Sequence, residues 1–227
     1  MVLLDALGTL VELEPPWPLL AAELAARGAH VGEDAAREAM LAEIAFYRAE
    51  HHLAADRAGL EALRDRCAEV LRDALPGPAR ELPHAEVRAA LLGALRFRAF
   101  PEVSRALGEL RAAGHRLVVV SNWDVSLHDV LAETGLRDLV DGAVTSAEVG
   151  AAKPGTGLFR AGLELAGARP EEALHVGDSV EHDVVGARAA GIAAALVARE
   201  EVQPVPDGVP ILASLAELPA LVAAYPP

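Results

Sequence analysis

The sequence predicts an α/β fold, a Rossmann-like parallel sheet with helices on both faces, into which an all-helical domain is inserted. From about residue 97 onward, short apolar runs alternate with helical patterns, as they do in βαβ units. The apolar runs are continuous rather than alternating, which is typical of parallel strands covered on both faces. The 227 residues suffice for one α/β domain and a small insert.

Five apolar runs are expected to form the sheet. The first stands at the beginning of the chain and stops at Asp5. A run rich in valine ends at Ser121 and Asn122, and another leads into Gly177 and Asp178. The predicted strands are 2–4, 116–120, 142–144, 173–176 and 194–197.

Helical patterns fill the stretches between these runs. Four of them close at a glycine, which is favoured just beyond the C-terminus of a helix. The last begins at a capping box, in which Ser214 is followed three residues later by Glu217. The predicted helices are 101–113, 124–134, 157–166, 180–190 and a final one from about 214.

The stretch 14–96 has a different character. Prolines open it, helical patterns without a convincing strand follow, and further prolines interrupt it near its end. We therefore expect a discontinuous core domain, 1–13 and 97–227, with a helical domain at 14–96 inserted after the first strand.

Composition narrows the class of partner. The net charge of −14 argues against nucleic acid, which recruits basic surfaces. It leaves room for a small anionic substrate, because a bound metal can reverse the local charge. The single cysteine, Cys67, excludes an intrachain disulfide, and no apolar stretch approaches the roughly 20 residues that span a bilayer. We expect a cytoplasmic protein without a membrane partner, either a monomer or a homodimer.

Polar side chains stand where the predicted strands end. In an open parallel sheet, ligands bind at the carboxyl ends of the strands. Asp5, Ser121 with Asn122, and Asp178 occupy such positions, and Lys153 lies in the loop after a weaker strand. These side chains should therefore converge on one cleft although they are far apart in the sequence.

This set suits displacement at phosphorus or carbon. A carboxylate such as Asp5 can act as a covalent nucleophile, and Asp178 with Asp183 offers the hard oxygen ligands that Mg²⁺ prefers. A hydroxyl and an ammonium can bind the oxygens of a transferring phosphoryl group. Lys153 is the only lysine among 20 lysine and arginine residues, which indicates that this position requires a compact ammonium.

Four motifs carry a resemblance to a known family. The segment 5–10, Asp-Ala-Leu-Gly-Thr-Leu, resembles the first motif of the haloacid dehalogenase superfamily. Val-Ser-Asn at 120–122 resembles its second motif, Lys-Pro at 153–154 its third, and Gly-Asp-Ser at 177–179 with Asp183 its fourth. The order and the strand-end setting match over 1–13 and 97–227. The helical domain stands where this family places its first type of cap.

The resemblance implies a role for each matching residue. Asp5 is the nucleophile, and Thr9 orients the site beside it. Ser121 binds the transferring group with Asn122 next to it, and Lys153 neutralises charge. The implied Mg²⁺ ligands are Asp5, the main-chain carbonyl of Leu7 and Asp178, with Asp183 supporting or joining them. The implied activity is that of a phosphatase acting on a small phosphate ester through an aspartyl-phosphate.

One position departs from the phosphatase pattern. Phosphatases of this superfamily usually carry a second aspartate two residues after the nucleophile as a general acid and base, and here that position is Leu7. General acid–base catalysis contributes about 10²–10⁴-fold. Two alternatives stay open: a catalytically weak binding or regulatory module, and a 2-haloacid dehalogenase, whose halide leaves without a proton. Dehalogenases need no metal, however, and tend to lack the acidic fourth motif that Asp178 and Asp183 preserve here. Phosphonate cleavage is a further alternative.

Further polar residues of the sequence allow a structural as well as a functional interpretation. Four residues of the helical domain could face the cleft and replace the missing acid–base group, or they could form a solvated helix face: Tyr47, Arg48, His51 and His52. His175, near the end of a predicted strand, is expected to be packed and hydrogen-bonded rather than catalytic.

Overall fold

The computed structural model describes residues 1–199 and 204–224. The chain divides into two compact units, which we call the core unit (Met1–Glu12 with Ala99–Pro227) and the helical unit (Leu13–Arg98). Each unit is described by itself.

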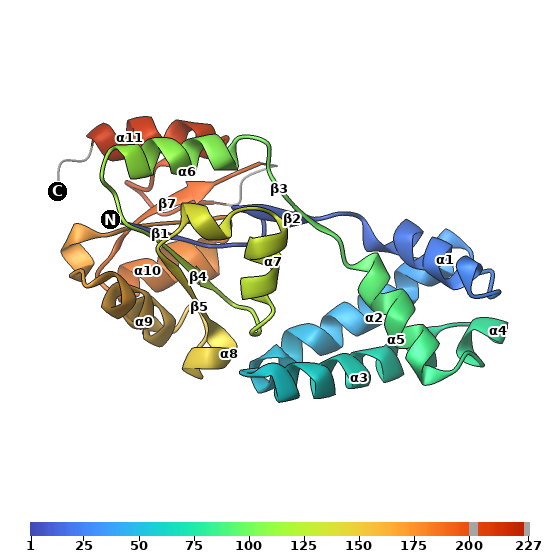
Figure 1. Ribbon diagram of the computed structural model, residues 1–227. Coiled ribbons are helices and arrows are strands. Elements are labelled where there is room, and N and C mark those ends of the chain that lie inside the picture. Colours follow the sequence, from blue (N-terminus) through green and yellow to red (C-terminus); the bar gives the residue numbers. More distant parts are fainter. Residues whose placement is uncertain (200–203, 225–227) are drawn as a thin grey trace. The chain divides into compact units, whose positions relative to one another are not determined.

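The core unit is built on a six-stranded sheet in the order β5-β4-β1-β6-β7-β8 (Figure 1). All five strand pairs are parallel. The predicted Rossmann-like α/β fold is therefore confirmed, and the short β8 adds a strand that was not expected. The strands are β1 (Val2–Leu4), β4 (Leu117–Ser121), β5 (Gly142–Thr145), β6 (Leu174–Gly177), β7 (Ala193–Val197) and β8 (Ile211–Leu212).

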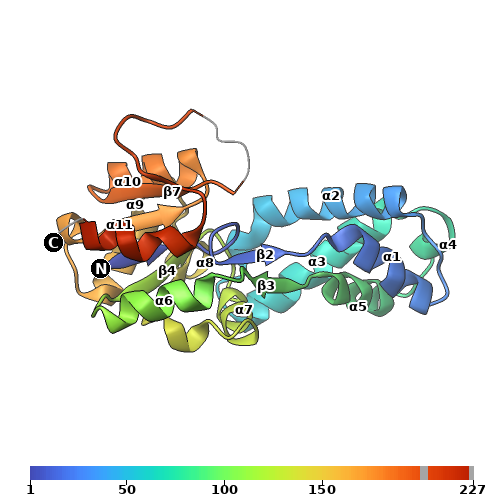
Figure 2. The same ribbon diagram turned by 90° about the horizontal axis from the view of Figure 1, so that it is seen from above.

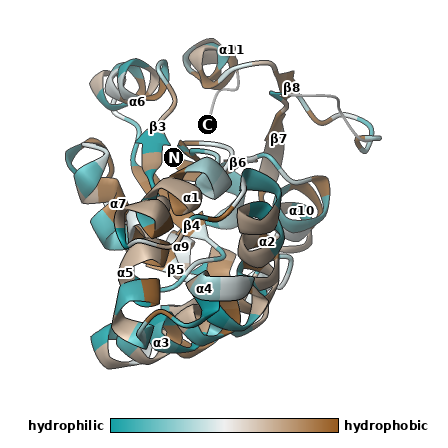
Figure 3. Cartoon of the chain, turned by 90° about the vertical axis from the view of Figure 1, so that its right-hand side faces the viewer, coloured by the Kyte–Doolittle hydropathy of each residue, from teal (hydrophilic) through white to brown (hydrophobic). Residues whose placement is uncertain are grey.

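Helices cover both faces of the sheet. In Figure 1, α6 (Val103–Ala112) and α11 (Leu218–Ala224) lie on one face, and α9 (Thr156–Ala166) and α10 (Gly186–Ala189) lie on the other. Phe159 and Leu163 of α9 pack with Leu3 and Val120 of the central strands, and all four side chains are buried. Burial of each such side chain stabilises the folded state by about 1.5–3 kcal/mol, because its apolar surface is removed from water. The continuous apolar character of β7 is visible in Figure 3.

The remaining helices of the core unit are short. They are α7 (Leu127–Glu133), α8 (Ser146–Val149), three 3₁₀ turns and a π-helix at Val180–Val185. The prediction of one regular α-helix over 180–190 is therefore wrong in its first half. The amide of Val184 reaches back five residues to the carbonyl of Ser179 at 3.2 Å, which widens the first turn. The 3₁₀ turns are Arg137–Leu139, Pro170–Glu172 and Leu215–Glu217.

The helical unit consists of helices that lie alongside one another (Figure 2). Their buried faces supply a separate apolar core that includes Leu24, Met40, Leu63 and Leu71. Among the described residues, no helix combines the length and the apolar character needed to cross a bilayer. The helices are α1 (Pro16–Ala26), α2 (Glu33–Glu50), a 3₁₀ turn (His51–Leu53), α3 (Arg57–Ala74), α4 (Gly77–Arg80) and α5 (His84–Ala94).

Two short strands stand where the chain passes between the units. β2 (Val11–Leu13) pairs with β3 (Phe97–Ala99) in a separate two-stranded sheet. Hydrogen bonds flank the pair, from the amide of Glu14 to the carbonyl of Arg96 at 2.9 Å and from the amide of Phe100 to the carbonyl of Leu10 at 3.1 Å. Neither strand was expected from the sequence.

Candidate active site

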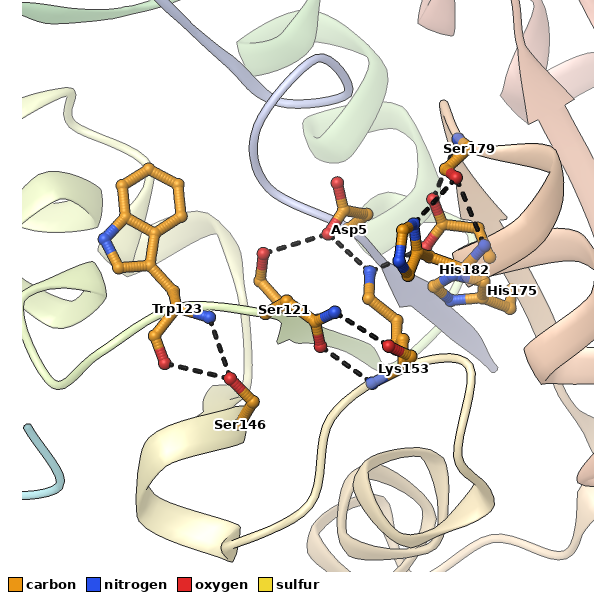
Figure 4. Close-up of polar contacts among 10 residues, drawn as sticks. Asp5, Ser121, Trp123, Ser146, Lys153, His175, Ser179 and His182 are labelled. Atoms are coloured by element: carbon orange, nitrogen blue, oxygen red, sulfur yellow. Dashed lines mark hydrogen bonds and ion pairs between the residues drawn. The ribbon is translucent and has the colours of Figure 1, made fainter. Parts of the chain in front are cut away.

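Five polar side chains meet at the carboxyl edge of the sheet. Asp5 follows β1, Ser121 ends β4, and Asp178 follows β6, while Asp183 lies in the π-helix. Lys153 reaches them from the loop between α8 and α9 (Figure 4). Parallel neighbours bring these positions together because β1 pairs with both β4 and β6.

The carboxylate of Asp5 is held by one of its two oxygens. Ser121 Oγ donates a hydrogen bond to Oδ1 at 2.9 Å, and Lys153 Nζ donates another to the same oxygen at 2.5 Å. Among the described residues, none donates to Oδ2. The residue is almost fully buried, and its amide donates to the carbonyl of Val176 at 2.9 Å. Asp5 therefore presents one anchored oxygen and one oxygen that is available for chemistry.

Lys153 is the cation of the site. Its buried ammonium also donates to Asp183 Oδ1 at 2.6 Å. Burial alone would lower the pKa of Lys153, but the carboxylates of Asp5 and Asp183 outweigh it and raise the pKa, so the ammonium stays protonated. A buried cation between two carboxylates holds both in place.

Asn122 fixes the main chain at Lys153. Its Nδ2 donates to the carbonyl of Lys153 at 2.9 Å, and its Oδ1 accepts from the amide of Lys153 at 2.8 Å. The peptide bond between Lys153 and Pro154 is cis. The resemblance implies that Asn122 lies next to Ser121 at the transferring group, and its side-chain amide binds the main chain of the loop that carries Lys153.

Asp183 accepts three hydrogen bonds. Besides Lys153, it accepts from His175 Nε2 at 2.9 Å on Oδ1 and from the amide of Ser179 at 2.9 Å on Oδ2. Burial works against ionisation, but Lys153 and His175 together lower the pKa of Asp183. A β-carbon at Gly177 would lie 2.1 Å from Asp183 Cγ, so only glycine leaves room for this carboxylate. The expected packed and hydrogen-bonded state of His175 is confirmed, and its ring meets Phe159 edge-on with centroids 5.0 Å apart.

Asp178 is the most exposed of the three carboxylates. Carboxylate oxygens of Asp5, Asp178 and Asp183 all lie within 4.8 Å of one another. Partial burial raises the pKa of Asp178 to about 7, and repulsion from Asp5 and Asp183 adds to the rise. Burial likewise raises the pKa of Asp5, although Lys153 opposes it. Three carboxylates around a single ammonium leave an excess of negative charge, and their hard oxygens fit a bound Mg²⁺.

Leu7 and Thr9 lie in the turn that follows β1. The Leu7 side chain is 42% exposed and carries no proton to transfer. Thr9 is fully buried, and its Oγ1 has no hydrogen-bond partner among the described residues. The main chain of this turn is closed on the carbonyl of Ala6, which accepts from the amides of Leu10 and Val11 at 2.8 and 2.9 Å.

The four residues singled out in the helical domain lie at the C-terminal end of α2. Tyr47 and Arg48 belong to its last turns, and His51 and His52 open the 3₁₀ turn that follows. The rings of Tyr47 and His51 are 5.7 Å apart, and His51 Nδ1 lies 3.1 Å from the carbonyl of Arg48. They form one local cluster on the helical unit.

Two contacts near the site were not anticipated. Ser179 Oγ lies 3.1 Å from His182 Nδ1 and accepts from the amide of His182 at 3.1 Å, at the start of the π-helix (Figure 4). Ser146 Oγ accepts from the amide of Trp123 at 3.1 Å and donates to its carbonyl at 3.3 Å. The second contact joins the loop after β4 to α8, and no local pattern in the sequence predicts it.

The sequence of the chain is similar to the sequences of known hydrolases. The model of a family of haloacid dehalogenase-like hydrolases matches residues 1–191. The chain is 44% identical over 117 residues to haloacid dehalogenase-like hydrolase domain-containing protein 3 of Mus musculus, covering 49% of this chain and 47% of that protein. It is 38% identical over 155 residues to a phosphoserine phosphatase of Thermus thermophilus, covering 62% and 59% respectively. The chain thus spans about half the length of the curated relatives it matches.

Solved structures share the architecture over nearly the whole chain. A phosphatase of the same superfamily from Thermococcus onnurineus has a TM-score of 0.67 at 26% identity, covering 97% of this chain and 96% of that one. An L-2-haloacid dehalogenase from Xanthobacter autotrophicus has a TM-score of 0.72 at 20% identity, covering 99% and 98%, and shows the fold alone. Because the family model covers most of the sequence and these structures share its fold, the chain belongs to the haloacid dehalogenase-like hydrolase family.

Proposed function

We propose that the protein hydrolyses a small phosphate ester in a Mg²⁺-dependent reaction that passes through an aspartyl-phosphate on Asp5. The observation that carries this proposal is the state of the Asp5 carboxylate. Its Oδ1 is anchored by Ser121 and Lys153, and its Oδ2, beside two further carboxylates, has no donor within the described part of the chain. The names of the phosphoserine phosphatase and the Thermococcus onnurineus phosphatase support phosphate ester chemistry.

The first step forms a bond between Asp5 Oδ2 and phosphorus. The bond from phosphorus to the ester oxygen breaks, and the leaving group departs with its electron pair. In the second step, the oxygen of a water molecule bonds to phosphorus, the bond to Asp5 breaks, and inorganic phosphate is released. Ser121 and Lys153 orient the carboxylate through their hydrogen bonds to Oδ1. The third N–H of the Lys153 ammonium is left to donate to a phosphoryl oxygen, whereas the single proton of the Ser121 hydroxyl can do so only by leaving Asp5.

The metal ligands we propose are Asp5, Asp178 and the main-chain carbonyl of Leu7, with Asp183 supporting them. When bound, Mg²⁺ would supply positive charge that offsets the repulsion between these carboxylates and an anionic substrate. Thr9 orients the turn next to Asp5, and Asn122 positions the main chain that carries Lys153.

Leu7 sets a limit on the leaving group. Nothing at this position can protonate an alkoxide, so esters of acidic alcohols or phenols should react faster than alkyl esters. The same feature favours the second candidate, a binding or regulatory protein that retains the scaffold with weak catalysis. A 2-haloacid dehalogenase is the third candidate, since a halide also leaves without a proton.

The helical unit is proposed to act as the cap that selects the substrate. Tyr47, Arg48, His51 and His52 are its candidate substrate-binding residues, because they gather donors and aromatic rings on one turn and a half of helix. A cytoplasmic location and a monomeric or homodimeric state stay predictions of the sequence.

The test is hydrolysis of p-nitrophenyl phosphate, first with Mg²⁺ and then with EDTA. This ester needs no proton at its leaving group, so the missing acid at Leu7 does not limit formation of the aspartyl-phosphate. We expect turnover with Mg²⁺, none with EDTA, and none in Asp5→Asn. The matched control is Asp138→Asn, which removes an exposed carboxylate in a 3₁₀ turn and should keep full activity.

The other outcomes decide between the alternatives. Wild-type turnover in Asp5→Asn would remove Asp5 from its role. Absence of turnover in the wild-type protein would favour the binding module. Release of halide from a 2-haloacid in the presence of EDTA would identify a dehalogenase.

A further inference from the structure

Arg199 joins four partners just beyond β7. Its Nε donates to the carbonyl of Gly8 at 3.1 Å, and its Nη2 donates to the carbonyl of Thr9 at 2.9 Å. Its Nη1 pairs with Glu102 Oε1 at 2.7 Å, and the guanidinium carbon lies 3.4 Å from the centre of the Phe100 ring. The side chain is 21% exposed. All of these residues belong to the core unit.

The carbonyls that Arg199 binds are consecutive, and they follow Leu7 directly. The turn is closed at its base by hydrogen bonds to the carbonyl of Ala6 and from the amide of Gly8 to the carbonyl of Val11 at 2.8 Å. Beyond Arg199, no described residue donates to the carbonyls of Gly8 and Thr9. The amides of the same two peptide groups, those of Thr9 and Leu10, donate to the carbonyl of Ala6 at 3.3 and 2.8 Å. The carbonyl side of each group is therefore held by one guanidinium, and the amide side by the base of the turn.

The other partners follow β3 directly. The amide of Phe100 also contacts the turn, since it donates a hydrogen bond to the carbonyl of Leu10 at 3.1 Å. Residues 8–10 stand immediately before β2, and residues 100–102 stand immediately after β3. Arg199 thus joins the core-unit ends of both connections to the helical unit.

We propose that Arg199 is a positioning residue of the active site, which holds the turn so that the Leu7 carbonyl and the backbone of Gly8 face Asp178. A planar guanidinium can donate to both carbonyls and to Glu102 at once, because its N–H groups form a rigid fork. A lysine at this position would supply the charge without the fork. Residues that orient metal ligands affect metal affinity or activity by about 10- to 100-fold when they are replaced.

The first experiment follows hydrogen–deuterium exchange of the full chain without metal. In Arg199→Ala, exchange of the amides in 6–11 should rise relative to the wild-type protein, while the rest of the sheet keeps its protection. Arg199→Lys should restore part of the protection. The matched control is Arg188→Ala, because exposed Arg188 also donates to a main-chain carbonyl, that of Asp207 at 2.9 Å, but does not touch the turn. Glu102→Gln separates the ion pair from the carbonyl contacts and should leave 6–11 protected.

The second experiment measures Mg²⁺ binding by isothermal titration calorimetry, and the Mg²⁺ activation constant with p-nitrophenyl phosphate. Arg199→Ala should weaken Mg²⁺ by about 10- to 100-fold, with KM for the ester nearly unchanged. A general loss of stability would instead lower the melting temperature, and Mg²⁺ binding would not be weakened selectively over binding of the ester. If Arg199→Ala fails to fold, Arg199→Lys and Arg199→Gln carry the comparison.

The kinetic part rests on the proposed function, whereas the exchange measurement does not. A wild-type protein without phosphatase activity would reject the proposed function and leave the exchange result to decide on Arg199. Unchanged exchange of 6–11 in Arg199→Ala, or Mg²⁺ affinity within twofold of the wild-type value, would overturn the proposal.

Discussion

A β-carbon at position 8 would lie 2.1 Å from Oδ2 of Asp178, so the backbone of Gly8 and this carboxylate occupy adjoining space. The φ angle of Gly8 is +82°, in the left-handed region that other residues adopt at a cost. Glycine at this position therefore serves both the shape of the turn and the place of the acidic group.

Gly8→Ala should damage the site more than the fold. The left-handed backbone costs about 1–3 kcal/mol for a residue with a side chain. The added β-carbon would also force the carboxylate of Asp178 to shift from its place. We expect Mg²⁺-dependent activity to fall by about 100-fold, in line with the loss of a positioned metal ligand. Steady-state kinetics measures the loss of activity, and chemical denaturation measures the loss of stability separately.

The control for this substitution is Gly28→Ala. Gly28 also has a φ angle of +82°, but a β-carbon there meets nothing within 4 Å. It should lose comparable stability and keep its activity. Equal activity losses in both variants would show that backbone strain, rather than the approach of Asp178, accounts for the effect.

Leu7→Asp should add the missing proton donor. The position is 42% exposed, so an aspartate can be accommodated without burial of its charge. We expect hydrolysis of an alkyl phosphate to rise by about 10²–10⁴-fold, and formation of the aspartyl-phosphate from p-nitrophenyl phosphate, followed as the burst of p-nitrophenol, to change far less. Leu7→Asn, which has the same shape but no acid, should give no gain. A similar gain in both variants would assign the effect to polarity at this position.

Lys153→Met should destabilise the core unit. Its removal leaves the buried carboxylates of Asp5 and Asp183 without their cation, and breaking a buried pair in this way costs about 3–5 kcal/mol. Urea denaturation checks the expected loss. The control, Arg169→Met, breaks an exposed ion pair with Glu172 and should change stability little. A loss in Lys153→Met as small as in the control would mean that the site tolerates unpaired carboxylates.

The sheet could be predicted because its strands are continuous apolar runs that end in polar residues. Val118 to Val120 show this most clearly, since all are fully buried between covered faces. β1 is equally short, but it is wholly apolar and could be recognised as one run. β2 and β3 escaped prediction because charged Glu12 and Arg98 interrupt them, and β8 because it has only two residues. Their pairing depends on neighbours that only the folded chain brings near.

Residue types and their positions at strand ends pointed to Asp5, Ser121, Lys153, Asp178 and Asp183 as one group. The lone lysine was informative because a compact ammonium fits between two carboxylates at 2.5 and 2.6 Å. Arg199 could not be found this way, since it is one of many arginines and its partners are about 100 and 190 residues away in the chain. The π-helix depends on the tertiary contacts of Asp183, which no local pattern encodes.

Glu43 places an acidic group inside the helical unit. It lies on α2 and is 3% exposed, and the thiol of Cys67 on α3 donates a hydrogen bond to it. Burial raises the pKa of Glu43 from 4.5 to about 7, although the Cys67 contact opposes the rise. Folding therefore favours the protonated form of this side chain.

The pH dependence of stability follows from the raised pKa. Below about pH 4.5, both folded and unfolded chains carry the proton, and Glu43 costs no ionisation energy. Between about pH 4.5 and 7, only the unfolded chain releases the proton, so stability falls as pH rises. Above about pH 7 the cost levels off at about 3 kcal/mol, the equivalent of the difference between the two pKa values.

Glu43→Gln should remove this dependence, because an amide has the same shape and no proton to lose. Its free energy of unfolding should exceed that of the wild-type protein at pH 8 by up to about 3 kcal/mol, and the difference should shrink toward pH 5. Urea denaturation is monitored by the fluorescence of Trp17. Trp17 and Trp123 are the two tryptophans of the chain, so in a Trp123→Phe background the signal reports on the helical unit alone. Glu38→Gln, at an exposed position of the same helix, is the matched control and should follow the wild-type profile. Parallel pH profiles for Glu43→Gln and the wild-type protein would show that Glu43 is ionised at no cost within the folded helical unit.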